Sequence, residues 1–274
     1  MIRRAWQNGL WQLVLTLIVL VWLSPVLWIV DVSLRTRPEI ATTALTLLPR
    51  HPTLGNFAEV LRGTHVPEYF ANSLYIAGGA TAVAVTVAAL ATYVLARFRF
   101  GGRQHLLAWI LSLRMTPPIA MVVPYYLMFR QLRLLDSPAG LIVAYLPVTV
   151  PFAVWVLYGF MRDIPSELDE AAALDGCTPW AAFWRIILPA SRASVAVAAI
   201  FTFITAWNEF LLALILTGSH TKTFAVGMSE FVLSYEVQWG QLCAATVLFL
   251  VPLLAAIYLL QRHIVRGLTL GAIQ

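Results

Sequence analysis

Charge is scarce along this chain. Only 11% of its 274 residues are charged, whereas 60% are hydrophobic and the mean hydropathy is +0.80. Soluble domains carry about 25% charged residues and about 45–50% apolar ones. Several apolar runs also reach the roughly 18 residues that mark a membrane-spanning helix, which argues against a soluble protein with a large core. The composition therefore predicts an integral membrane protein.

Cysteine and lysine are nearly absent. Cys177 and Cys243 lie in different segments with no CxxC or metal-ligand spacing, so we expect neither a disulfide framework nor a metal site. Lys222 is the only lysine, and its surroundings, SHTKTF, do not form the GxxxxGKS or GxxxxGKT loop that holds nucleotide phosphates. Arginine supplies the other basic side chains, and arginine at membrane edges faces anionic lipid. We therefore expect membrane lipid as a partner, and no nucleic acid.

Catalytic motifs are missing as well. The five histidines are scattered and form no HExxH pair, and no serine lies in a GxSxG turn. We therefore expect no catalytic residues, and a membrane-embedded enzyme is a weak alternative. A secondary transporter is the other alternative, but it would need charged relay residues in several spans and internal inverted repeats, and neither is evident.

Six apolar runs are long enough to cross the roughly 30 Å hydrocarbon core as helices. The first is too long for a signal peptide and no A-x-A cleavage site follows it, so we expect it to be retained. Together the runs predict an all-α integral membrane protein whose residues 1–274 form a single transmembrane domain. The expected spans cover residues 10–30, 72–96, 105–129, 139–161, 193–216 and 240–261.

The distribution of arginine indicates the orientation of these spans. The short loop 96–103, ARFRFGGR, is strongly basic, whereas the basic residues on the opposite side lie mainly in the longer loop 31–71. Since basic loops stay in the cytoplasm, we expect both termini and the segment between the fourth and fifth spans there.

Proline and polar residues interrupt the middle spans. Pro117 and its neighbour Pro118 lie in the third span, and two more prolines lie in the fourth. Proline frees backbone carbonyls, so either a kink that lines a water-filled pathway or a simple packing kink accounts for them. Ionisable residues inside a membrane point to function by default. The candidate substrate-pathway residues are Arg114, Pro117, Trp207, Asn208 and Glu209.

Two of these candidates, Arg114 and Glu209, carry opposite charge. They either pair between the third and fifth spans, or each separately lines a polar cavity or reaches an interface. Asn208 and Trp207 suit contact with a polar solute, since they offer hydrogen bonds and a stacking surface.

The segment 163–189 gathers acids, glycine and aromatics between two apolar runs, and its pattern predicts two short helices. Asp163 is a candidate N-cap of the first helix, and Gly176 is a candidate left-handed stop. A second helix starts after Thr178. Its apolar stripe consists of Trp180, Phe183, Trp184 and Ile187. From the residues alone, this segment is either a docking face for another protein or a connector between spans.

The same segment resembles the hallmark motif of ABC-importer permeases, which reads E-A-A, three residues, G, nine residues, I-x-L-P. Here the pattern runs from Glu170-Ala171-Ala172 through Gly176 to Ile186-Ile187-Leu188-Pro189, and every fixed position matches. The resemblance extends over nearly the whole chain, through FANSL, AWNEFLLALILT and QRHIVRGLTLGAIQ. The chain is similar to the shorter permease subunit of the maltose-type carbohydrate-uptake branch, although relatives often end in a Gly-Ala-Val-Lys-like tail where this chain ends in Gly-Ala-Ile-Gln.

The resemblance implies a type I ABC importer permease fold, with a cytoplasmic coupling helix between the fourth and fifth spans that docks into a groove of an ATPase. It implies that this chain forms half of the translocation pathway while ATP and Mg bind to the ATPase, so that this chain binds no cofactor. The implied ATPase-coupling residues are Glu170, Ala171, Ala172, Asp175, Gly176, Ile186, Leu188 and Pro189.

The resemblance also implies partners at a bacterial inner membrane. They are a second permease subunit in a heterodimer, two copies of the cytoplasmic ATPase, and an extracytoplasmic solute-binding protein or lipoprotein. The outer loop 217–239 would face that binding protein, unless it is an ordinary interfacial loop. The solute is a sugar, an amino sugar, a polyol or a glycerophosphodiester, and the sequence does not name it. The candidate binding-protein contacts are Thr217, Gly218, Lys222 and Phe224.

Overall fold

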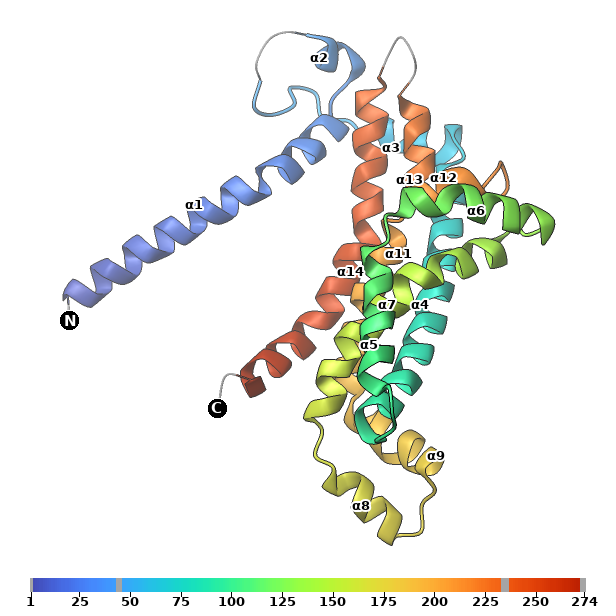
Figure 1. Cartoon of the computed structure of the whole chain (residues 1–274). Coiled ribbons are helices and arrows are strands. Elements are labelled where there is room, and N and C mark those ends of the chain that lie inside the picture. The colour runs from blue at the N-terminus through green and yellow to red at the C-terminus, as the bar shows by residue number, and fades with distance from the viewer. Residues whose placement is uncertain (1, 43–45, 233–236, 272–274) are drawn as a thin grey trace. The chain divides into compact units, whose positions relative to one another are not determined.

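A computed structural model of the chain describes residues 2–42, 46–232 and 237–271 (Figure 1). Within these ranges the regular structure is helical, and the only strand-like feature is an isolated bridge between Val232 and Val237. The chain divides into two compact units, Met1–Pro67 with Met228–Val251, and Glu68–Gly227 with Pro252–Gln274. The expectation of one permease domain stays a prediction.

Four helices are long and apolar enough to cross a membrane, and they confirm four of the expected spans as helices. α4 begins six residues before its expected span, and α14 continues beyond residue 261. If each bent helix pair described below counts as one span, the number rises to six. The four helices are α1 (Ile2–Ser33), α4 (Val66–Arg97), α7 (Pro138–Asp163) and α14 (Trp239–Gly271).

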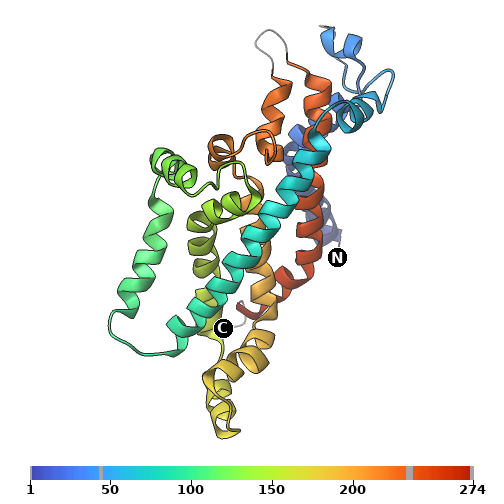
Figure 2. The ribbon, with the colours of Figure 1, turned by 90° about the vertical axis from the view of Figure 1, so that its right-hand side faces the viewer.

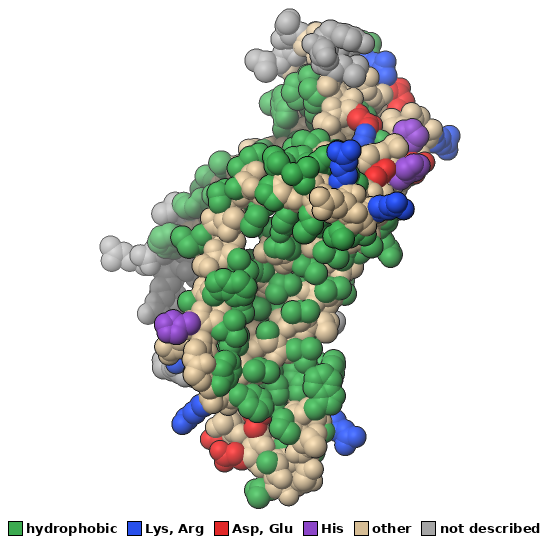
Figure 3. Space-filling view, turned by 45° about the vertical axis from the view of Figure 1, so that its right-hand side comes forward, with side chains coloured by type: hydrophobic (Ala, Val, Ile, Leu, Met, Phe, Trp, Pro, Cys, Tyr) green, Lys and Arg blue, Asp and Glu red, His purple; other side chains and the backbone are tan. Residues whose placement is uncertain are grey.

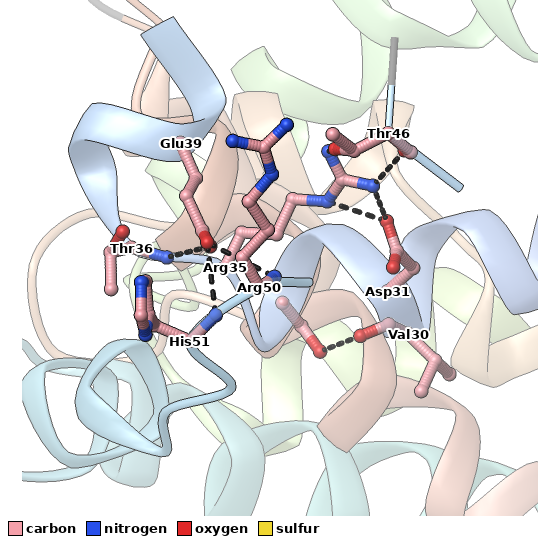
Figure 4. A network of polar contacts seen from close by, with 9 residues as sticks. Val30, Asp31, Arg35, Thr36, Glu39, Thr46, Arg50 and His51 are labelled. Carbon is pink, nitrogen blue, oxygen red and sulfur yellow. Dashed lines mark hydrogen bonds and ion pairs between the residues drawn. The ribbon is translucent and has the colours of Figure 1, made fainter. Parts of the chain in front are cut away.

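The first unit holds α1, the short helices α2 (Arg37–Ala41) and α3 (Gly55–Gly63), and the beginning of α14. The apolar side chains of α1 are exposed, as expected of a helix that faces lipid or another subunit. Polar contacts hold the chain after α1 (Figure 4): the buried Arg35 donates to Asp31 at 2.7 Å, and the Glu39 carboxylate accepts the backbone N–H groups of Arg50 and His51, both at 3.0 Å.

The second unit is built around α4, α7 and α11. Small side chains lie where these helices meet, and small residues let helix backbones approach closely inside a membrane. Three of them, Ala88, Ala153 and Ala198, are fully buried. The unit also contains α5 (Arg103–Ser112), η1 (Leu113–Met115), α6 (Pro118–Gln131), α8 (Glu167–Leu174), α9 (Pro179–Ala182), η2 (Phe183–Ile187), α10 (Leu188–Ala190), α11 (Arg192–Trp207), α12 (Leu211–Leu216) and α13 (Phe224–Gly227).

The expected third span, residues 105–129, is not one straight helix. α5 with η1 and α6 meet at a bend of 94° (Figure 2). The bend falls at two successive prolines: Thr116 is extended because it precedes Pro117, and Pro117 is extended because it precedes Pro118. Single prolines inside the helices do not break them, as Pro147 and Pro151 in α7 show.

The expected fifth span, residues 193–216, is also interrupted. α11 ends at Trp207 and α12 begins at Leu211, with Asn208 as the C-cap of the first helix. A second bend, of 78°, separates the Pro179–Ala190 helix from α11. Hydrophobic side chains cover most of the face drawn in Figure 3, and acidic and arginine side chains gather at the end where α8 lies in Figure 1.

Candidate coupling site

The helix α8 carries the start of the E-A-A motif, and its N-terminus differs from expectation. Asp163 is the last residue of α7, so its assignment as the N-cap of the next helix is wrong. Ile164 is extended because it precedes Pro165, and this ends α7. α8 starts after Ser166, whose side chain makes no capping hydrogen bond. Three acids crowd its first turn, where the helix dipole favours them.

The C-terminus of α8 has the predicted stop. Gly176 has a φ of 77°. This left-handed conformation is unfavourable for residues that carry a Cβ atom, but glycine adopts it readily. The N–H of Cys177 donates to the carbonyl of Ala172 at 2.9 Å, and the N–H of Gly176 donates to that of Ala173 at 3.0 Å. These two bonds form a Schellman motif, which satisfies carbonyls that a helix end leaves open. The turn at Gly176 is therefore closed by its own backbone.

The second helix of the segment begins as predicted and then departs from the α-helical repeat. Thr178 caps α9 by accepting the N–H of Ala181 at 3.2 Å. Phe183–Ile187 is π-helical, and such a turn shifts the spacing that a 3.6-residue repeat would give. Phe183 and Ile187 are buried, whereas Trp180 is 62% exposed and Trp184 is also exposed. The expected apolar stripe is nevertheless continuous, because the rings of Trp180, Phe183 and Trp184 contact one another, with two of its four members buried and two exposed.

A polar contact that the sequence reasoning missed joins α8 to the end of α4. The carboxylate of Asp169 lies 2.9 Å from Nε of Arg97 and accepts the hydroxyl of Tyr93 at 3.2 Å. The same hydroxyl lies 3.3 Å from the carbonyl of Pro179, and the Tyr93 ring lies 5.1 Å from that of Phe183. The sequence contained a sign of this contact, since a basic loop and an acidic segment were both expected on the cytoplasmic side. We refer to Tyr93, Arg97 and Asp169 as the α8 anchor.

The exposed side of α8 offers a contact surface. Ala172 is buried, and it packs the helix onto its own unit. Leu174 is 90% exposed at the end of α8, and the sequence reasoning did not single it out. The remaining motif residues differ in burial: Ile186 and Leu188 are half-buried, whereas Glu170, Ala171, Asp175, Gly176 and Pro189 are exposed. In Figure 1, α8 extends from the end of its unit where α4 ends and α9 follows.

The candidate pathway residues do not form the arrangement that was expected. The guanidinium of Arg114 lies over the rings of Phe152 and Trp155, 4.9 and 5.2 Å from their centroids. The carboxylate of Glu209 accepts the N–H of Leu212 at 3.0 Å and so caps α12. Among the described residues Arg114 and Glu209 do not form an ion pair, so the pairing alternative is wrong.

The neighbours of Glu209 are also occupied by local contacts. The side chain of Asn208 donates to the carbonyl of Ile204 at 2.7 Å. Trp207 is buried and packs against Phe70 and Phe203, with ring centroids 5.7 and 5.5 Å away. In this structure Trp207 therefore offers no face on which a sugar could stack.

The segment after α12 is tied to the α6–α7 connection by one carboxylate. Asp136 accepts the backbone N–H groups of Gly218, His220 and Thr221, at 2.9, 3.3 and 3.0 Å, and the hydroxyl of Thr221 at 2.7 Å. Burial opposes ionisation of Asp136, but these hydrogen bonds outweigh it and hold its pKa below the ordinary value of 3.8. We call this arrangement the Asp136 clamp.

The four candidate binding-protein contacts lie in or after this clamp, and they are not equally accessible. Gly218 is exposed and Thr217 is half-buried. Lys222 is half-buried, with its ammonium 5.5 Å from the centroid of the Tyr69 ring. Phe224 is buried, so its assignment to a contact surface is wrong for this structure. Residues 233–236 of the outer loop fall outside the described residues.

These features define a class of protein. Four helices long and apolar enough to cross a membrane, with two bent helix pairs that could add two more spans, define an α-helical integral membrane protein. Among the described residues no three His, Cys, Asp or Glu side chains gather in a way that could hold a metal ion.

Comparison with known proteins identifies the family. Residues 80–270 match the family described as "Binding-protein-dependent transport system inner membrane component". The chain is 36% identical to the trehalose transport system permease protein SugB of Mycobacterium tuberculosis, over 96% of this chain and 97% of that protein. It is 32% identical to the sulfoquinovosyl glycerol transport system permease protein SmoH of Agrobacterium fabrum, over 92% and 89%. This chain belongs to the family of binding-protein-dependent inner-membrane components, the permease subunits of ABC importers.

A solved structure agrees on the fold. A chain of a bacterial ABC transporter involved in the import of the acidic polysaccharide alginate aligns with a TM-score of 0.79 and 18% identity, over 92% of this chain and 94% of that chain. The all-α membrane-permease fold is thereby confirmed, whereas the count of six spans and the coupling helix stay predictions. The chain is a transporter subunit of the inner membrane and not the ATPase, and the enzyme and secondary-transporter alternatives are not favoured.

Proposed function

We propose that α8 and the turn at Gly176 form the element through which a cytoplasmic ATPase drives this permease. The observation that carries the proposal is the combination of a closed helix end, an anchored root and an exposed Leu174. A helix held at its root by Asp169 and closed at its tip by Gly176 moves as a rigid body. A push on its exposed side is therefore transmitted to α4 and α9 instead of being absorbed by a flexible loop.

The assembly follows from this role. The chain pairs with a second permease subunit in a heterodimer, and two ATPase copies bind ATP and Mg on the cytoplasmic side. An extracytoplasmic binding protein or lipoprotein delivers the solute. Both termini lie in the cytoplasm, on the side of the coupling residues. The support is the basic loop at the end of α4, which carries the anchor residue Arg97, together with the family match.

The outer contact surface is the exposed part of the Asp136 clamp. Gly218 and Thr217 are accessible there, and Lys222 stands beside them. Because Asp136 accepts three backbone N–H groups within four residues of this segment, the segment holds one shape before any partner arrives. A preformed surface loses less conformational freedom on binding.

The solute is a sugar or a related polar compound. The relatives' names, which mention trehalose and sulfoquinovosyl glycerol, support this class without choosing a member. The translocation pathway runs past Arg114 and Pro117 at the α5–α6 bend and past the helix break at Asn208 and Glu209. Irregular backbone at membrane depth is tolerated where it lines protein or water, as a pathway for polar solutes would require.

The test of the coupling proposal is purification of the affinity-tagged chain with its companions. The wild type should bring down an ABC ATPase, whereas Glu170→Lys and Gly176→Trp should insert into the membrane normally and lose both the ATPase and uptake. Full association and transport in both variants would refute the docking role of α8. Failure of the wild type to recover any ATPase would refute the proposed function as a whole.

A further inference from the structure

A cavity of about 220 Å³ lies beside the α5–α6 bend. Since a water molecule takes about 30 Å³ of liquid, the cavity has room for several waters or for one polar group of a solute. It is lined by side chains from several helices and from the bend itself. Those that carry the argument are Arg114, Thr116, Phe152 and Thr205.

Three helices place this cavity at the same depth. Arg114 comes 11 residues after the start of α5, Phe152 comes 11 residues before the end of α7, and Thr205 comes 13 residues after the start of α11. At about 1.5 Å per residue, each lies about 16–20 Å from the end of the unit that carries α8. The hydrocarbon core is about 30 Å thick, so this distance corresponds to roughly half the length of a membrane-spanning helix.

The cavity contains a positive charge that lacks a carboxylate partner among the described residues. Arg114 rests on the rings of Phe152 and Trp155, and no ion pair or hydrogen bond from its guanidinium forms in that part of the chain. The ring faces offset part of the cost of the charge. They leave the N–H groups on the edge of the guanidinium available, and Arg114 is exposed, so these groups are accessible to a ligand in the cavity.

Hydroxyl groups complete the lining. Thr205 donates its proton to the carbonyl of Phe201 at 2.9 Å, so its oxygen is left to accept from a ligand. Thr116 adds a second hydroxyl at the bend, where the extended backbone is not part of a helix. The cavity therefore combines one cation with hydrogen-bond acceptors, which suits a solute that bears both an acid and hydroxyl groups.

We propose that this cavity contacts the translocated solute and that Arg114 selects sugars carrying an acidic group, a carboxylate or a sulfonate. The inference rests on the proposed role of the chain as the permease of a sugar importer. The planar guanidinium pairs with such a group through two parallel N–H bonds. Thr116 and Thr205 bind the hydroxyl groups. A neutral sugar of the same size leaves the charge of Arg114 uncompensated.

The test is equilibrium dialysis of the purified complex, with its ATPase and second permease but without the binding protein, against labelled D-glucuronate and D-glucose. The two probes differ at one group, because D-glucuronate carries a carboxylate where D-glucose carries a hydroxymethyl group. The wild type should bind D-glucuronate about ten-fold or more tightly than D-glucose, since a charge-assisted pair distinguishes the two. Arg114→Gln should abolish the preference, Arg114→Lys should keep part of it, and Arg130→Gln, at an exposed arginine of α6, should keep all of it.

Three results would overturn the inference. In the first, the wild type binds both probes alike or binds neither. In the second, Arg114→Gln keeps the preference for D-glucuronate. In the third, the wild type shows no preference and Arg114→Gln loses the second permease subunit, which would make Arg114 a subunit contact. If the wild type still recovers the ATPase, any of these three results contradicts only the role of Arg114. The proposed coupling function is then unaffected.

Discussion

Asp169 holds two elements together that the sequence presents as separate. Its carboxylate pairs with Arg97 and accepts a hydrogen bond from Tyr93, both on α4, while its own helix α8 carries the E-A-A motif. Both partners in the ion pair are largely shielded, with side-chain exposures of 13% for Arg97 and 23% for Asp169. Removal of one partner from such a shielded pair leaves the other charge uncompensated, which costs more than the loss of a pair on an open surface.

Replacing this carboxylate tests the anchor. Asp169→Asn removes the charge that Arg97 faces, so we expect α8 to open more often and its amides to exchange with solvent roughly ten-fold faster, the equivalent of about 1.4 kcal/mol. Hydrogen exchange measured by mass spectrometry on the reconstituted protein checks this. Glu167→Gln removes an exposed acid from the same helix turn and should leave exchange unchanged; equal rates in the wild type and Asp169→Asn would show that the anchor contributes nothing.

Gly176 provides a second test at a single residue. Its φ of 77° is unfavourable for an L side chain by about 1–2 kcal/mol, so Gly176→Ala should destabilise the end of α8 by about that amount. A Cβ at this position meets no atom within 4 Å, so strain and not collision is the cause. Gly101→Ala is the matched control, because Gly101 has equal space around it and no positive φ. Equal stability of the two variants, measured by thermal unfolding, would contradict the assignment.

Sequence reasoning at the residue scale succeeded where a single local rule decides. Gly176 was predicted as a left-handed stop and Thr178 as a cap, because both depend only on neighbouring backbone. It failed for Phe224 and Trp207, whose burial depends on segments far away in the chain. It also missed Leu174, because an exposed leucine and a buried one look the same in a sequence.

At the scale of elements, the Asp136 clamp joins the α6–α7 connection to the segment before α13. Four hydrogen bonds to one ionised group hold this segment, and bonds to charged groups contribute about 1.5–3 kcal/mol. The clamp lies just before Lys222, which is the only lysine in the sequence. A protease that cuts after lysine therefore reports on this segment alone.

We expect Asp136→Asn to loosen the segment and to speed cleavage at Lys222 by roughly ten-fold or more. Asp163→Asn, at an exposed acid that ends α7, is the control and should leave the rate unchanged. The pKa of Asp136 is held below 3.8, so its stabilising effect is complete above that value and is lost only as the pH falls through the lowered pKa. The ratio of the two rates should thus stay constant from pH 6 to pH 9; a ratio that falls toward one within this range would refute an ionised clamp.

The α5–α6 bend is the other element with a clear test. Pro117→Ala with Pro118→Ala restores two backbone N–H groups and lets the helix continue, so we expect the protein to insert but uptake to fall severely. Pro124→Ala alters a proline inside α6, where the helix already runs on, and should transport normally. Uptake assays with immunoblots of membrane levels make the comparison, and normal uptake in the double variant would show that the bend has no role in transport.

The sequence predicted the long helices because an apolar run of sufficient length has one stable solution in a bilayer. It predicted a kink near Pro117, but not a bend of 94°, since the angle depends on how α6 packs against α12. The break at Asn208 carried no proline signal. The residues that indicate this break are Asn208 and Glu209, which cap the helices on either side of it. They were interpreted instead as pathway residues.

At the scale of the whole molecule, this chain is one part of a transporter. The family match and the fold identify a permease subunit, and the energy for transport comes from ATP bound elsewhere. The described surface is consistent with such a role: α1 exposes most of its apolar side chains, and α8 exposes Leu174 and two acids, Glu167 and Glu170, at the end of its unit. We expect the apolar surface of α1 to contact lipid or a membrane partner. We expect the exposed surface of α8 to contact a soluble partner.

The central claim is that Leu174 lies against a cytoplasmic ATPase, and photo-crosslinking tests it most directly. A photoreactive residue at position 174 is compared in whole cells with one at position 54, where Leu54 is 68% exposed on a segment expected on the other side of the membrane. The account predicts a crosslink from position 174 to the ATP-binding subunit and none from position 54. Absence of that crosslink at position 174, or equal crosslinking at both positions, would contradict it.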